Sequence, residues 1–249
     1  MKTLIVNPNT TDAVTRIIQE EARRSAPPHH EIVAVSARFG TQYVENRAEA
    51  AIAGHAVLDA IAAHGEDCDA VIVAAFGDPG VEAARELFDV PVVGISESAF
   101  HFAYLLGRRY SVVCMTPRLR TWYIECAHAA DMSARLASVR ALPTLPGTLE
   151  TARTAARAAL LEQCLRAVDE DDAEVLIVGG GPLAGLAREL APELPVPVID
   201  GVSCAVRMVE ALHALGPRKP VRGSFARPAA KPALGLADPL QRRITRDGD

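Results

Sequence analysis

The sequence has no uninterrupted apolar run near the ~20 residues that a membrane-spanning helix needs, so no membrane partner is expected. The start, Met1-Lys2-Thr3, leads into a short strand-like run and not into the apolar core of a secretory signal. Five cysteines are odd in number and scattered, so they form neither a metal motif nor a disulfide framework. These absences predict a cytoplasmic protein with reduced thiols.

Aromatic residues make up only 4% of the chain, the net charge is −5, and no basic patch carries interleaved aromatics, so nucleic acid is not an expected partner. The sequence also has no Ser-His-Asp order, no HExxH, no Walker A loop and no GxGxxG fingerprint. We therefore expect no metal, nucleotide or pyridoxal phosphate cofactor. What remains is an ordinary globular composition, in which 49% of 249 residues are hydrophobic.

One stretch, DAVIVAAFGDPG from Asp69 to Gly80, organises the chain. Its apolar run, residues 70–75, predicts a strand of a parallel sheet that is covered on both faces. A Gly/Pro loop follows, and then a helix over residues 81–88. A strand, a glycine-rich loop and a helix N-terminus together predict a pocket floor for an anionic or carbonyl ligand.

A second copy, EVLIVGGGPLAG, runs from Glu174 to Gly185. A "PV" strand follows each copy, beginning at Val90 and Val196, and LIVNPNTTD near the N-terminus matches YSVVCMTPRL, which starts at Tyr110. Three paired segments in the same order predict two similar α/β halves. The loops after residues 75 and 180 are then expected on opposite walls of one cleft.

The predicted domains follow from this repeat. We assign residues 1–107 and 200–215 to a first lobe and residues 108–199 to a second lobe. Residues 216–249 form a tail rich in Pro, Arg and Lys, without a helical or strand period. The tail is either disordered or, over residues 224–236, an arm that packs on the fold or on a neighbouring subunit through Phe225 and Leu234.

Polar side chains that end the first strand of each half are candidate ligand contacts. Asn9 and Thr10 follow the first strand of the chain and can bind a carboxylate or imide, although helix capping alone also explains them. Thr116 is the corresponding contact in the second half. Cys114, close before it, either faces the cleft or lies in the core.

Two further residues are candidate proton carriers near the central loop. Asp78 is either a base or the turn residue that often precedes a proline. His101, on the expected helix 98–106, either carries a proton or is structural.

Several of these segments together resemble one family. Seven segments are similar to segments of hydantoin and allantoin racemases, which belong to the aspartate/glutamate racemase superfamily. They are NPNTT, RFGTQYVENRAEA, AFGDPG, PVVGISESA, GGGPLAGLA, PVIDGVSCAV and RGSFARPAAKP. The resemblance covers nearly the whole chain. It implies two pseudo-symmetric α/β lobes with parallel sheets flanked by helices, and an active site between them.

The resemblance also implies a cofactor-free reaction. In that family one cysteine thiolate removes the proton α to a carbonyl, and a second thiol protonates the opposite face. The corresponding positions here are Ala75 and Gly180, so both thiols are absent. Neither a methyl group nor a hydrogen atom can accept a proton.

The binding groups that remain give the expected function. The substrate-binding residues are expected to be Asn9, Thr10, Phe76, Gly77, Thr116, Gly180, Gly181 and Pro182. We expect a hydantoin racemase-like enzyme, a homo-oligomer, that acts on a small cyclic amide or α-substituted carboxylate by enolate stabilisation, with the two-cysteine racemisation lost. Asp78, Cys114 and His101, in that order, are the expected proton-transfer groups. The alternatives are a hydrolase or lyase of a similar compound, or a non-catalytic binding protein.

Overall fold

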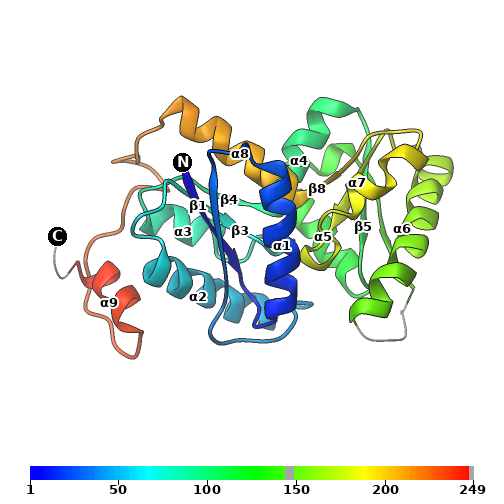
Figure 1. Cartoon of the computed structure of the whole chain (residues 1–249). Coiled ribbons are helices and arrows are strands. Elements are labelled where there is room, and N and C mark those ends of the chain that lie inside the picture. Colours follow the sequence, from blue (N-terminus) through cyan, green and yellow to red (C-terminus); the bar gives the residue numbers. More distant parts are fainter. Residues whose placement is uncertain (144–148, 247–249) are drawn as a thin grey trace.

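A computed structural model of the chain shows two four-stranded parallel sheets flanked by helices (Figure 1). It describes the backbone of residues 1–143 and 149–246, and the side chains of these residues except 149–155. The first sheet has the order β2 (Glu31–Ser36), β1 (Lys2–Asn7), β3 (Ala70–Val73) and β4 (Val92–Gly94). The second repeats it with β6 (Leu136–Ala141), β5 (Tyr110–Cys114), β7 (Val175–Gly179) and β8 (Val198–Asp200). The predicted fold class is therefore confirmed.

The strands are parallel because a helical connection after each strand returns the chain to the end of the sheet at which the strands begin. In the first half these helices are α1 (Asp12–Ser25), α2 (Arg47–His64), α3 (Val81–Leu87) and α4 (Ile95–Leu106). In the second half they are α5 (Leu119–Ala129), α6 (Leu149–Asp171), α7 (Leu186–Leu190) and α8 (Gly201–Leu215), with short 3₁₀ turns η1 (Ser133–Arg135), η2 (Gly181–Leu183) and η3 (Ala191–Glu193).

Two helices join the halves. α4 follows the first sheet but also contacts β7 and β8, whereas α8 follows the second sheet and contacts β3 and β4. The two helices pack against each other in the middle of the molecule (Figure 1). One hydrophobic core consequently includes residues of both sheets, such as Ile72 and Ile177, neither of which is exposed. The loops after β3 and β7 are held in a fixed relation by this shared core.

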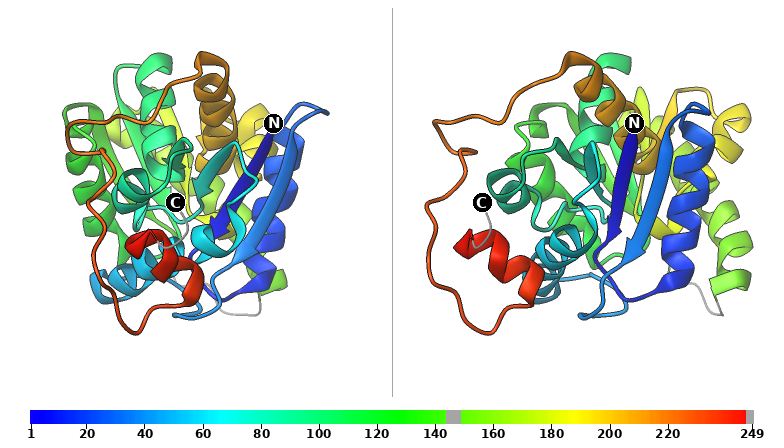
Figure 2. Two further views of the ribbon diagram at one scale, coloured as in Figure 1. Left: turned by 90° about the vertical axis from the view of Figure 1, so that its left-hand side faces the viewer. Right: turned by 60° about the vertical axis from the view of Figure 1, so that its left-hand side comes forward.

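The tail wraps around the first sheet's side of the molecule and ends in α9 (Asp238–Thr245), which packs on α2 (Figure 2). The expectation that the tail has no helical period is wrong, because Leu240 and Ile244 are spaced by one helical turn and face the core beneath α2. Leu234 is 94% exposed and anchors nothing, which corrects its expected role. The Phe225 ring lies 5.8 Å from the Arg85 guanidinium carbon.

The tail is instead held at its start by Lys219. The Lys219 ammonium donates hydrogen bonds to the carbonyl oxygens of Arg85, Glu86 and Phe88, at the end of α3. A cation suits this position because the last carbonyl groups of a helix carry partial negative charge. Over the part of the chain that the structure describes, no helix is both long and apolar enough to cross a membrane.

Candidate active site

A cavity of about 460 Å³ lies where the ends of β3 and β7 approach each other. Ala75 and Gly180, the two positions at which the sequence resemblance implies thiols, both line it. The rest of the lining is largely apolar and comprises Asn9, Val14, Tyr43, Val44, Glu45, Ala74, Phe76, Met115, Thr116, Leu119, Tyr123, Gly181 and Pro182. The structure therefore brings together six of the eight predicted binding residues and leaves Thr10 and Gly77 outside this lining.

The wall from the first sheet is the segment after β3. Phe76 is 3% exposed, and its ring centroid lies 4.5 Å from that of Tyr123 on α5, so the two halves contact each other across this wall. Gly77 turns away from the cavity, and its N–H donates to the Ser96 hydroxyl oxygen at 3.2 Å. Gly77 has a φ of +113°, which favours glycine, so its role is to let the loop adopt this conformation.

Asp78 lies outside the cavity lining. Its two carboxylate oxygens accept hydrogen bonds from the backbone N–H groups of Ser96 (2.9 Å) and Glu97 (2.8 Å), in the first turn of α4. Burial, together with the nearby Glu97 carboxylate, raises the pKa of Asp78 to about 7. The carboxylate thus caps a helix, and it belongs to a neighbouring hollow that also includes Trp122.

The wall from the second sheet is made of glycines. Gly180 has a φ of +128°, which L-residues with a side chain rarely adopt. A Cβ on Gly181 would lie 3.0 Å from the Ile18 Cδ1 and 3.3 Å from the Ala74 carbonyl oxygen. The close approach of the two halves explains why this loop is built from glycines, and Pro182 lies in the middle of η2, which begins at Gly181.

The Tyr123 hydroxyl oxygen lies beside Gly180, together with the Met115 and Pro182 side chains. A Cβ at Gly180 would lie 3.9 Å from the Tyr123 hydroxyl oxygen. Tyr123 is only 3% exposed, yet no hydrogen bond from its hydroxyl occurs within the described residues. Burial raises the pKa of this phenol well above its ordinary value, so the group stays protonated at neutral pH.

Glu45 is the single carboxylate among the described residues that line the cavity. The Thr116 hydroxyl donates to its Oε1 at 3.5 Å, which links segment 37–46 to the end of β5. This segment is held by the Thr10 N–H, which donates to the Thr41 carbonyl at 3.1 Å, and by the Glu45 N–H, which donates to the Glu49 carboxylate at 2.7 Å. Thr10 therefore supports the loop that carries Glu45.

Asn9 points an amide at the same cavity. Its Oδ1 accepts hydrogen bonds from the Asn7 amide at 3.0 Å and from the Thr11 N–H at 2.9 Å. With the oxygen used in this way, the Asn9 NH₂ group is the end that is left to donate to a ligand carbonyl.

The other two proposed proton carriers are not brought to the cavity. Cys114 is 0% exposed, its thiol points to the Thr116 carbonyl oxygen at 3.3 Å, and burial raises its pKa to about 12. His101 is exposed on α4, with Nδ1 2.7 Å from the Glu97 carbonyl oxygen. Cys114 is the last residue of β5 and its side chain faces the core, whereas His101 lies on the outer side of α4 and faces solvent.

Sequence reasoning missed Glu45 and Tyr123. A signal for Tyr123 exists in the helical spacing of Leu119, Tyr123 and Ala127, all buried on one side of α5. Glu45 lies in the segment RFGTQYVENRAEA, in which no periodicity shows which side chain turns inward.

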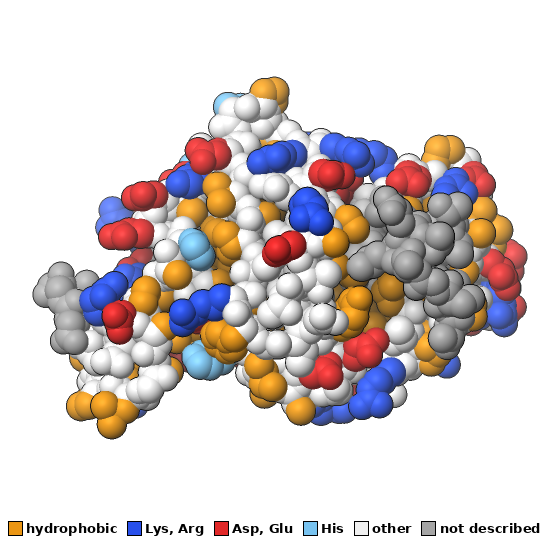
Figure 3. All heavy atoms as spheres, turned by 60° about the horizontal axis from the view of Figure 1, so that its bottom comes forward, with side chains coloured by type: hydrophobic (Ala, Val, Ile, Leu, Met, Phe, Trp, Pro, Cys, Tyr) orange, Lys and Arg blue, Asp and Glu red, His pale blue; other side chains and the backbone are white. Residues whose placement is uncertain are grey.

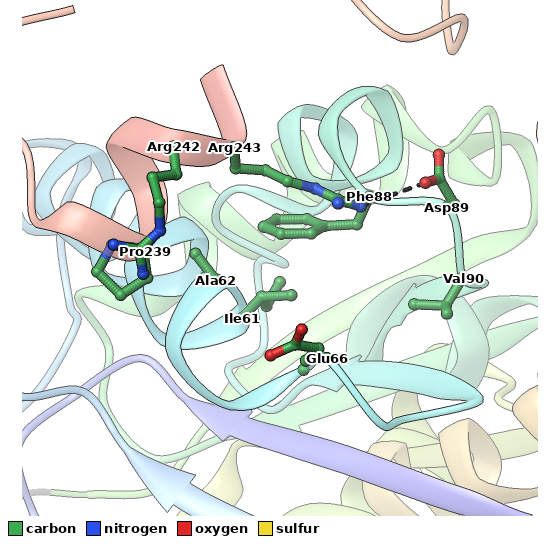
Figure 4. A pocket seen from close by; sticks show the side chains of 10 residues that line it. Ile61, Ala62, Glu66, Phe88, Asp89, Val90, Pro239, Arg242 and Arg243 are labelled. Atoms are coloured by element: carbon green, nitrogen blue, oxygen red, sulfur yellow. Dashed lines mark hydrogen bonds and ion pairs between the residues drawn. The ribbon is translucent and has the colours of Figure 1, made fainter. Parts of the chain in front are cut away.

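A second cavity, of about 490 Å³, lies between α9, the end of α2 and residues 88–90 (Figure 4). The Arg243 guanidinium carbon lies 5.3 Å from the centroid of the Phe88 ring, and the guanidinium donates to Asp89 at 3.3 Å. Its lining shares no described residue with the cavity of Ala75 and Gly180. Within the described ranges, no group of His, Cys, Asp and Glu side chains is arranged to hold a metal ion.

Comparisons with known proteins agree with this geometry. The family model described as Asp/Glu/Hydantoin racemase matches residues 4–209. A hydantoin racemase from Pseudomonas sp. (strain NS671) is 35% identical over 98% of this chain and 99% of its own length. The structure of an allantoin racemase from Klebsiella pneumoniae matches with a TM-score of 0.91 at 38% identity, over 97% of this chain and 99% of that chain. An allantoin racemase from Pseudomonas fluorescens matches with a TM-score of 0.90 at 39% identity, over 94% of this chain and 100% of that one.

Proposed function

The chain belongs to the Asp/Glu/hydantoin racemase family and is an enzyme of this racemase type, and on that premise we propose that it labilises the α-proton of a small, neutral cyclic amide such as a hydantoin. The substrate lies in the cavity between the two sheets. The observation that carries this proposal is that Ala75 and Gly180 line one cavity from opposite halves of the molecule. A ligand there has its α-carbon between the two positions from which this family's chemistry is expected.

The neutral charge of the substrate follows from the lining. No Lys, Arg or His is among the described residues that line the cavity, and Glu45 contributes a carboxylate. A substrate carboxylate in this place has no cation to pair with and is repelled by Glu45, which is costly away from water. On the described part of the face shown in Figure 3, acidic and basic side chains are interspersed, so this face has no continuous positive patch to attract an anionic substrate. A cyclic amide is therefore favoured over an α-substituted carboxylate.

Enolate stabilisation is assigned to amide groups. The backbone N–H groups of Phe76 and Gly180 donate no hydrogen bond to a protein acceptor within residues 1–143 and 149–246, and the Asn9 NH₂ group is directed by its own contacts. Such preorganised donors stabilise the negative charge that develops on a carbonyl oxygen when the α-proton leaves. This part of the chemistry needs no thiol.

The two-thiol route is absent, because a methyl group and a hydrogen atom stand at positions 75 and 180. We expect the α-proton to be exchanged with solvent faster than the configuration is inverted, because each missing acid or base removes a contribution of typically ~10²–10⁴-fold.

The test uses a single enantiomer of 5-benzylhydantoin in deuterated water. Loss of the C5–H signal is followed by NMR, and loss of optical rotation is followed in the same sample, with protein-free buffer as the blank. We expect exchange above the blank, with slower loss of rotation. Exchange no faster than the blank contradicts the proposed function, and ring opening seen by mass would identify a hydrolase.

A further inference from the structure

The Tyr123 hydroxyl lies close to residue 180, the position at which the family resemblance implies the second thiol. Its hydroxyl oxygen is 3.9 Å from the position of a Cβ at residue 180, so a thiol built at that position and this hydroxyl would reach the same part of the cavity. The ring is fixed by Phe76 on one side and by the i−4 neighbour Leu119, both of which are buried. The hydroxyl has no protein partner within the described residues, so its proton is available to a ligand.

Glu45 supplies the complementary group. It is the carboxylate that lines the cavity, and its contact with the Thr116 hydroxyl holds it there. Glu45 comes from segment 37–46, whereas Tyr123 comes from α5 in the second half of the chain. A buried phenol that stays protonated and a carboxylate therefore share one cavity, and general acid–base chemistry needs such a pair.

We propose that Glu45 and Tyr123 are the catalytic base and acid of this enzyme, in place of thiols at residues 75 and 180. The inference rests on the proposed function, because it names the groups that move the proton in the same cavity.

Each step balances. The Glu45 carboxylate takes the α-proton, the C–H bond breaks, and its electron pair moves into the adjacent carbonyl to give an enolate. Glu45 can return a solvent-derived proton to the same face, which exchanges the proton and retains configuration. Alternatively, Tyr123 gives its hydroxyl proton to the other face and becomes a phenolate, which recovers a proton from the Glu45 carboxylic acid through solvent.

The two outcomes differ in rate. Burial raises the pKa of Tyr123, so a turnover that ends with a phenolate is uphill, whereas one that uses Glu45 alone is not. Exchange with retention is accordingly the faster outcome, and inversion depends on Tyr123.

The experiment compares full-length Tyr123→Phe and Glu45→Gln with the wild type on one enantiomer of 5-benzylhydantoin in deuterated water. Tyr104→Phe and Glu125→Gln are the matched controls, because both residues are exposed and neither lines the cavity. Circular dichroism and thermal melting confirm that each variant is folded. Exchange of C5–H and loss of optical rotation are recorded together.

We expect Tyr123→Phe to slow loss of rotation by about 100-fold or more while exchange persists, and Glu45→Gln to slow both by about 100-fold or more. A purely structural role of Tyr123 would slow both readouts together. Added formate is expected to restore exchange in Glu45→Ala, since it supplies a carboxylate to the emptied position.

If Tyr123→Phe loses optical rotation at the wild-type rate, or if Glu45→Gln exchanges the C5 proton at the wild-type rate, the assignment of the acid and base is overturned. The proposed function is then left intact. A wild-type protein that exchanges no faster than buffer overturns the proposed function, and the acid–base pair with it.

Discussion

The loops after β3 and β7 occupy equivalent places in the two sheets but are secured differently. In the first half, Asp78 within the loop caps α4, whose own N-cap residue is Gly94. In the second half, the N-cap residue of α8 is Asp200, whose carboxylate accepts from the Ser203 N–H at 3.0 Å. The capping carboxylate has thus moved from the loop to the strand end, which leaves the second loop as glycines and Pro182.

The difference distinguishes two possible roles of a loop carboxylate, catalysis and helix capping, which the sequence repeat alone does not distinguish. Asp78, in a loop beside the cavity, is easily taken for a catalytic base. The matching helix α8 has a carboxylate cap as well, and Asp200 at the end of β8 provides it. Asp78 is accordingly a structural group in this comparison, and the loop of Gly180 is free to take a conformation that serves the close contact between the halves.

The largest effect is expected from Gly94→Ala. A Cβ at this position would overlap the carboxyl group of Asp78, which must then leave the end of α4. We expect a loss of unfolding free energy of about 3 kcal/mol, measured by urea denaturation. Gly54→Ala is the control, because its Cβ would make an ordinary contact, 3.5 Å from the Gly80 nitrogen, inside a helix. Equal stability of the two variants would contradict the capping geometry.

Asp78→Ala and Asp200→Ala test the two caps directly. Each variant removes an acceptor for N–H groups at a helix start, which costs about 1–2 kcal/mol. We expect α-proton exchange to fall as well in Asp78→Ala, because its loop carries Phe76, and to stay unchanged in Asp200→Ala. Denaturation and the exchange assay measure the two effects, and an equal loss of exchange in both variants would remove the distinction between the loops.

Restoring the thiols should affect the two halves unequally. Ala75→Cys places a side chain on backbone that already carries one, and we expect little change in stability. Gly180→Cys forces a side chain onto a φ of +128° and is expected to cost about 1 kcal/mol or more. Thermal melting of both variants measures this asymmetry, and optical rotation should show at most a partial gain of racemisation in the double variant. A fully active double variant would show that the Gly180 loop readily returns to a thiol-bearing conformation.

A further comparison concerns the pH dependence of stability. The pKa of Asp78 is about 7 in the folded protein and near the ordinary 3.8 in the unfolded chain, so the folded state holds a proton across this window that the unfolded state releases. Unfolding free energy therefore falls as pH rises from about 4 to about 7 and is flat on either side of that window for this group. Asp78→Asn should lessen the fall in urea titrations, and an unchanged profile would show that Asp78 is ionised throughout.

The repeat in the sequence predicted the two sheets and the meeting of the loops at residues 75 and 180, because buried parallel strands leave continuous apolar runs that end in glycine. It did not predict Glu45 or Tyr123, since an irregular segment and a helix surface reveal inward-facing side chains only after the halves pack. Cys114 was misplaced for a related reason: a residue at a strand end faces either the core or the cleft, and alternation along a fully buried strand gives no preference.

α9 was missed because its apolar positions are only two, in a segment dominated by Pro and Arg. The tail's anchors are also of a kind that hydrophobicity does not reveal, since Lys219 binds carbonyl oxygens that exist as acceptors only at the end of α3.

The placement of α8 and α9 has a consequence for synthesis. The first sheet is formed by strands from residues 2–94, yet it is covered by α8 and flanked by α9, which follow all eight described strands in the sequence. The second sheet uses strands from one continuous stretch, residues 110–200. The first sheet therefore cannot be covered by α8 and α9 until residues 201–245 have been synthesised, whereas all four strands of the second sheet are present once residue 200 has been added.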